Sequence, residues 1–92
     1  MATLIRIDGT TVEVFPLNAH TFTLEELQTA VGGKTELLGM HGGNYMLVNE
    51  LALTHDYPLN KKASDVLSAD WTVKVKVFGH AFIVHQDQLE LL

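Results

Sequence analysis

The segment from Thr21 to Gly33 constrains the fold of this chain more than any other part, because it contains the start, the buried face and the end of one short helix. Thr23 is placed to cap the first turn, and Glu26 three residues later completes the capping-box pattern. Gly32 supplies the left-handed conformation that ends a helix. We therefore predict a helix over about residues 24–31.

The apolar residues of this segment fall on one stripe of the predicted helix. Their spacing of three and four residues is typical of a helix that packs on a core by one face. The residues of the stripe are Leu24, Leu27, Ala30 and Val31. Phe22, directly before the cap, is placed to contact Leu27 as a hydrophobic staple.

Segments of strand-like composition lie on both sides of the helix, bounded by turn residues. Asp8-Gly9 separates the first two, and this dipeptide is a strong signal for a β-hairpin. Val12 and Val14 share one face of the second, with Glu13 on the other. The predicted strands are residues 3–7, 11–15, 35–40, 45–48, 71–78 and 81–84.

This order of elements predicts an α+β fold with a ββαββ-like opening, in a single domain over residues 1–92. One main helix covers one face of a mostly antiparallel sheet of about six strands. We expect Leu24, Leu27 and Val31 to be buried against the alternating valines of residues 71–78. Residues 63–69 are expected to form at most one or two helical turns, and the tail from residue 86 a last turn or strand.

Composition excludes several functions. The chain has 92 residues, of which 47% are hydrophobic, and it has no cysteine, so disulfides, thiolate metal sites and a cysteine nucleophile are excluded. The formal net charge of −5 disfavours general binding to nucleic acid. No apolar run approaches the roughly 20 residues of a membrane span. We expect a cytoplasmic protein, in the host cytoplasm if the gene is carried by a phage, without membrane or nucleic-acid partners.

Candidate catalytic and metal-binding groups are few. Five histidines are present, and folding can bring His41, His55 and Asp56 together, although no pair has the helical spacing of a two-histidine metal site. Ser64 and Ser68 lack the context of a catalytic nucleophile. Carboxylates at Glu36, Glu50 and Asp56 are explained equally well as solvated side chains of a sheet edge. We therefore expect no enzyme activity, no metal and no cofactor.

The best candidate for a binding site is polar and lies between two predicted elements. The segment V-N-E at residues 48–50 ends a strand, and P-L-N at residues 58–60 follows an irregular crossing. Asparagine side chains here can either contact a ligand or hold the crossing by bonding the backbone. Nearby lysines can offset the charge of an anionic ligand, and glycines permit close approach. The predicted ligand-binding residues are Asn49, Glu50, Asn60, Lys34, Lys61, Lys62, Gly42 and Gly43.

Four motifs in fixed order resemble an uncharacterised family of small proteins carried by phages, plasmids and their bacterial hosts. They are L-E-E-L-Q-x-x-V-G-G at residues 24–33, an acidic residue at Glu36, V-N-E at residues 48–50 and P-L-N-x-x-A at residues 58–63. The resemblance extends over residues 23–84. The chain departs from the family pattern at Lys34, where an aromatic or apolar residue is usual, and at His80, where an acidic residue is common. The family has no settled activity, so the resemblance implies a mobile-element setting and no reaction.

Two classes of function remain. The first is a non-catalytic binding protein that captures a small anionic or nucleotide-like host molecule, such as an immune signal, as a homo-oligomer. The second is a protein-binding adaptor or an inhibitor of a host enzyme, which uses an acidic surface or an exposed strand edge. A concave, partly basic pocket favours the first class, and a flat acidic or apolar patch favours the second.

Overall fold

A computed structural model describes residues 2–52 and 54–89 of the chain. Two hairpins, two helices and a closing strand make up the fold. In chain order the elements are β1 (Ala2–Ile5), β2 (Thr11–Val14), α1 (Leu24–Val31), β3 (Thr35–Gly39), β4 (Asn44–Asn49), α2 (Lys61–Trp71) and β5 (Ala81–His85). Short 3₁₀ turns η1 (His41–Gly43) and η2 (Gln86–Gln88) precede β4 and follow β5.

The strands form one antiparallel sheet in the order β2-β1-β5-β4-β3. The α+β class and the ββαββ opening are therefore confirmed. Within the described residues the sheet has five strands where about six were predicted, and a second helix stands where only a turn or two was expected. The last described strand, β5, lies at the centre of the sheet, between β1 and β4.

The first hairpin forms around the predicted turn. Gly9 adopts a left-handed φ of +91°, and Asp8 Oδ1 accepts hydrogen bonds from the N–H and the hydroxyl of Thr10 at 2.9 and 2.7 Å. In the register of β1 and β2, Leu4 pairs with Val12 and Ala2 with Val14. Val12 and Val14 therefore share one sheet face, as predicted, while Glu13 points to the other.

Helix α1 has the bounds and caps that the sequence predicts. Thr23 Oγ1 accepts a hydrogen bond from Glu26 N–H at 3.2 Å, and the Glu26 carboxylate accepts one from Thr23 N–H at 2.9 Å. Gly32 ends the helix with φ +82°. Leu27 is 0% exposed and Val31 is buried, but Leu24 is 43% exposed and was wrongly assigned to the core. Leu24 is the first residue of the helix, at the edge of the stripe.

Helix α1 packs mainly over β3, β4 and β5. The core on this side contains Phe22, Leu27, Val31, Leu47 and Phe82, with the rings of Phe22 and Phe82 edge to face at 5.2 Å. The predicted contact with the valines of residues 71–78 is wrong. Val77 belongs to the core of the opposite face, and Val73 is 58% exposed.

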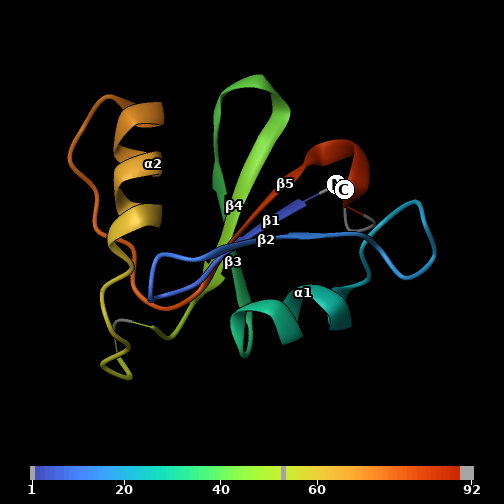
Figure 1. Cartoon of the computed structure of the whole chain (residues 1–92), viewed down its shortest axis with the longest axis horizontal. Helices are drawn as coiled ribbons and strands as arrows, with labels where there is room; N and C mark the ends of the chain where they lie inside the picture. Colours follow the sequence, from blue (N-terminus) through green and yellow to red (C-terminus); the bar gives the residue numbers. More distant parts are fainter. Residues whose placement is uncertain (1, 53, 90–92) are drawn as a thin grey trace.

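Helix α2 covers the other face of the sheet (Figure 1). Its residues Ala63 and Leu67 are fully buried against Ile5, Met46 and Val48. The helix begins at Lys61 because Asn60 caps it, accepting a hydrogen bond on Oδ1 from Ala63 N–H at 3.0 Å. The sheet therefore lies between two helices, which the prediction of one main helix missed.

Residues 71–78 do not form the predicted strand, although they alternate cleanly between apolar and polar. Trp71 ends α2, and the segment after it runs beside that helix, where serine side chains bind its backbone. Val77 N–H donates to Ser64 Oγ at 2.7 Å, and Val75 N–H donates to Ser68 Oγ at 2.9 Å. A single isolated bridge joins Leu59 and Phe78. The predicted hairpin between this segment and residues 81–84 is therefore wrong.

The start of the predicted tail returns to α1. Leu89 is buried and bridges Phe22, whose N–H donates to Gln88 O at 2.7 Å. The rest of the predicted apolar tail, residues 90–92, lies outside the described residues. Among the elements the structure describes, neither helix combines the length and the hydropathy that crossing a bilayer requires.

Truncation of the buried stripe tests this packing. Leu27→Ala should lower the free energy of unfolding by about 2–5 kcal/mol, because it leaves a cavity in the α1 core. Leu24→Ala removes the same atoms from an exposed position of the same helix and is the matched control. Urea unfolding should show a loss at Leu24 well below that at Leu27, and equal losses would contradict the assignment of Leu27 to the core.

Candidate functional site

Asn60, one of the predicted ligand-binding residues, is fully buried and bonded to the chain itself. Its Nδ2 donates to Ile5 O and to Gly79 O, both at 2.9 Å, and its Oδ1 caps α2. Its side chain is 0% exposed. Each polar atom of this side chain therefore has a backbone partner, so contact with a ligand requires that these bonds break.

Asn49 is also tied to the backbone, at the end of β4. Its Nδ2 lies 3.3 Å from Val31 O and 3.4 Å from Tyr57 Oη, and its Oδ1 accepts from Leu51 N–H at 2.8 Å. The residue is 5% exposed. Asn49 thereby joins the end of α1 to the loop that follows β4.

The other predicted binding residues are spread over the molecule. Glu50 N–H donates to Lys34 O at 2.9 Å, so these two residues lie beside Asn49. Lys61 is exposed and pairs with Asp65 at 3.2 Å, and Lys62 is exposed beside it. Gly42 and Gly43 lie in η1, at the opposite end of β4 from Asn49. The structure brings Asn49, Glu50 and Lys34 together, and it separates the glycines from them by the length of a strand.

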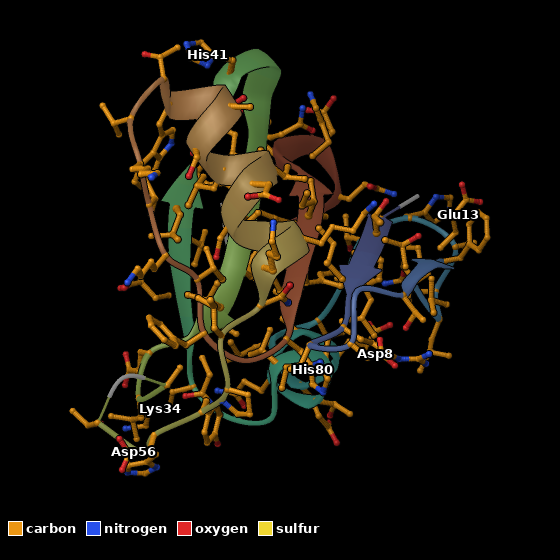
Figure 2. The ribbon with its side chains drawn as sticks, turned by 60° about the vertical axis from the view of Figure 1, so that its left-hand side comes forward. Asp8, Glu13, Lys34, His41, Asp56 and His80 are labelled. Atoms are coloured by element: carbon orange, nitrogen blue, oxygen red, sulfur yellow. The ribbon has the colours of Figure 1, made fainter. Side chains whose placement is uncertain are left out.

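His41 and the two serines have structural partners. His41 lies 3.1 Å from Asp70, and Figure 2 shows it at the opposite end of the molecule from Asp56. The grouping of His41, His55 and Asp56 is therefore wrong, and the described residues contain no cluster of three metal-binding side chains. Ser64 and Ser68 donate to Asn60 O at 2.7 Å and to Val75 O at 3.1 Å.

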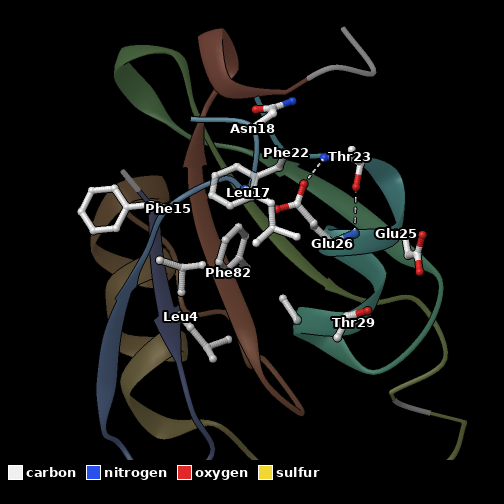
Figure 3. Close-up of a pocket in the computed structure, with 12 residues that line it drawn as sticks. Leu4, Phe15, Leu17, Asn18, Phe22, Thr23, Glu25, Glu26, Thr29 and Phe82 are labelled. Atoms are coloured by element: carbon white, nitrogen blue, oxygen red, sulfur yellow. Dashed lines mark hydrogen bonds between the residues drawn. The ribbon is translucent and has the colours of Figure 1, made fainter. Parts of the chain in front are cut away.

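One large pocket of the described structure is apolar and was not predicted. It has a volume of about 670 Å³ and lies between the β1–β2 hairpin, α1 and the loop that joins β2 to α1. Phe22, Phe82, Leu4 and Val14 contribute apolar surface to it, and α1 forms one wall (Figure 3). The described residues that line it are Leu4, Val14, Phe15, Leu17, Asn18, Phe22, Thr23, Glu25, Glu26, Thr29, Ala30 and Phe82.

Two large apolar side chains of this pocket are open to solvent. Leu17 is 91% exposed and Phe15 is 65% exposed, next to a cavity that is itself apolar. Single exposed apolar residues are common on protein surfaces, but a contiguous apolar patch with a cavity marks a binding surface. Volumes of about 300–1,000 Å³ are typical of ligand pockets.

Glu26 holds the loop that closes one end of this pocket. Besides capping α1, its carboxylate accepts a hydrogen bond from Leu17 N–H at 3.0 Å. These backbone hydrogen bonds, from Thr23 and then Leu17, hold the pKa of Glu26 below its ordinary value. Both carboxylate oxygens are thus occupied by the fold, and the position of Leu17 depends on them.

A smaller cavity of about 220 Å³ lies under the segment that follows α2. Two of the predicted site residues, Asn49 and Glu50, line it together with Glu36, Trp71 and Lys76. Its charged groups are therefore two carboxylates and one ammonium. This balance does not favour an anionic ligand.

Sequence reasoning missed the apolar pocket because the predicted strand over residues 11–15 includes Phe15, and no local pattern gives Leu17 a partner. The available signal was the segment F-P-L at residues 15–17, where large apolar residues continue beyond the last strand residue into a turn. Loops are normally polar, so apolar residues in a loop need a partner. Only the packing of α1 shows which partner surface is nearby.

Comparison with known proteins gives no relative: no family model, no curated protein and no solved structure matches this chain. The site must therefore be interpreted from its own geometry.

Replacement of Asn60 tests its structural role. Asn60→Ala should lower the free energy of unfolding by about 2 kcal/mol or more, because loss of an N-cap costs about 0.5–2 kcal/mol and an unsatisfied buried group about 1–3 kcal/mol. Lys62→Ala, at an exposed position two residues later, is the control and should change stability by less than about 0.5 kcal/mol. An unchanged unfolding midpoint for Asn60→Ala would contradict the structural role of the Asn60 hydrogen bonds.

The carboxylate of Glu26 should make stability depend on pH. Because its pKa is lower in the folded chain than the ordinary 4.5, its contribution is complete above that value and is lost as pH falls through the folded pKa. Glu26→Gln should therefore lower the melting temperature most near neutral pH, and the difference from the unmodified chain should shrink in acid. A difference in melting temperature that is constant from pH 7 to pH 2.5 would contradict the contribution of the ionised Glu26 carboxylate to stability. Glu25→Gln, at the neighbouring carboxylate, is the matched control.

Proposed function

We propose that this chain is a small non-catalytic binding protein, and that the apolar pocket between the β1–β2 hairpin and α1 is its binding site. The observation that supports this most is the combination of a cavity of about 670 Å³ with the exposed side chains of Phe15 and Leu17 at its mouth. An exposed apolar surface of this kind promotes aggregation when nothing covers it, so its presence supports a bound partner or ligand.

The charges of the lining select the chemistry of the occupant. Among the residues that the structure describes, the pocket is lined by two carboxylates, Glu25 and Glu26, and by no lysine, arginine or histidine. An uncharged or cationic occupant with apolar groups fits this lining, whereas an anionic one would meet like charge. Capture of an anionic, nucleotide-like molecule therefore has weaker support here than binding to a protein, the alternative that the sequence left open.

The titratable groups of the lining support a binding role over a catalytic one. Glu25 and Glu26 are the two in the described part of the lining, and Glu26 uses both carboxylate oxygens to hold Thr23 and Leu17. Paired acid–base chemistry needs two available groups. One available carboxylate can instead orient a partner.

The proposal also covers the genetic origin of the protein and its oligomeric state. The resemblance of the motifs at residues 24–63 to phage- and plasmid-borne proteins supports an origin on a mobile element. We also propose a homo-oligomer, for which β2 and β3, the two edge strands of the sheet, offer surfaces that a second copy can extend. The apolar pocket would then remain available to its own occupant.

Uptake of an uncharged apolar dye tests the pocket. Nile red should bind the unmodified chain with a rise in fluorescence, and Leu17→Asp should weaken binding at least tenfold, because it places a charge at the mouth of the pocket. Val73→Asp introduces the same charge at an exposed apolar residue outside the pocket and should leave dye binding unchanged. Equal loss in both variants, or no binding to the unmodified chain, would contradict the site.

A further inference from the structure

The two faces of the sheet are covered unequally. On the face that carries α2, the helix and the segment after it pack over β1, β4 and β5 through Ile5, Met46, Val77 and their neighbours. On the opposite face α1 has only eight residues and lies mainly over β3, β4 and β5. The β1–β2 half of that face is left to line the apolar pocket.

The uncovered half has the width of one helix. Neighbouring strands are about 4.8 Å apart, so two strands present a surface about 10 Å wide. Packed helices lie 8–10 Å from each other, axis to axis. A second helix beside α1 would therefore rest on Leu4 and Val14, above the buried ring of Phe82, with Ala30 of α1 at its side.

The walls of this space suit an amphipathic helix with basic flanks. Its apolar stripe would meet the floor of the pocket and the exposed side chains of Phe15 and Leu17. Glu25 lies in the first turn of α1, at the edge of the pocket and with its side chain directed outward (Figure 3), and none of the described lining residues is basic. A lysine or arginine beside the stripe would therefore gain a favourable contact, and a carboxylate there would be repelled.

We propose that the groove between α1 and the β1–β2 hairpin receives an amphipathic helix of a protein partner, with an apolar stripe and basic flanking residues. The helix completes the layer that α1 only half covers, in the helix-in-groove mode of recognition. This inference rests on the proposed function, because it names the class of partner for the same pocket.

Three synthetic peptides of equal length test the proposal by fluorescence anisotropy. The first carries leucines at helical spacing with lysines between them. The second replaces every lysine with glutamate, and the third has the composition of the first but alternates leucine and lysine in a strand pattern. The third controls for general attraction of cationic peptides to a chain of net charge −5.

The first peptide should bind at least tenfold more tightly than the other two. Leu17→Asp should weaken its binding at least tenfold, whereas Val73→Asp should not, and circular dichroism of the two variants checks that both are folded. Glu25→Lys should reduce the preference for lysine over glutamate flanks.

Several results would contradict the proposal that the occupant is an amphipathic helix. Equal binding of the first and third peptides would show general electrostatic attraction, and tighter binding of the third would show a strand as the occupant. A dimer in light scattering that Leu17→Asp dissociates would show a second copy in the groove. Nile red uptake without peptide binding would contradict the proposed helical partner but not the proposed binding site. Absence of both dye and peptide binding would contradict the binding site as well.

Discussion

The buried side chain of Asn60 is the interaction on which the arrangement of the two halves of the fold depends. Its side-chain N–H groups join the end of β1, through Ile5 O, to the segment before β5, through Gly79 O, and its Oδ1 caps the start of α2. Its backbone continues the same junction, since its N–H donates to Val77 O and its carbonyl accepts from the Ser64 hydroxyl. One residue thus places the second helix on the sheet and directs the chain into β5.

This junction explains why a short chain can place its last strand at the centre of a sheet. Residues 72–80 must pass from the end of α2 to the start of β5 with no strand pairing beyond the isolated bridge at Phe78. Ser64 and Ser68, one helical turn apart on α2, bind the backbone at Val77 and Val75 and so replace the missing ladder. The part of the chain that the structure describes contains no buried side-chain polar atom without a partner.

The opposite face of the sheet, which carries α1, is only partly covered. A helix of eight residues cannot cover five strands, and the loop that joins β2 to α1 covers only one end of the remaining space. Glu26 holds that loop at Leu17 through the same carboxylate that caps α1. The rim of the apolar pocket is therefore built from the capping motif that makes α1 recognisable, and the start of α1 and the position of Leu17 depend on the same side chain.

The sequence by itself determined the local structure. The caps of α1, its bounds, the hairpin at Asp8-Gly9 and the alternation of Val12 and Val14 follow from residues within a few positions of each other, whose conformations are set by short-range sterics and hydrogen bonds. The tertiary structure decided everything that depends on distant partners. The alternation at residues 71–78 did not become a strand, because Ser64 and Ser68 supplied its backbone partners. Asn60, placed by position as a ligand residue, became a buried clamp because Ile5 and Gly79, 55 and 19 residues away, had carbonyls to satisfy. The apolar pocket exists because strand order, which local patterns do not encode, put β1 and β2 beyond the reach of α1.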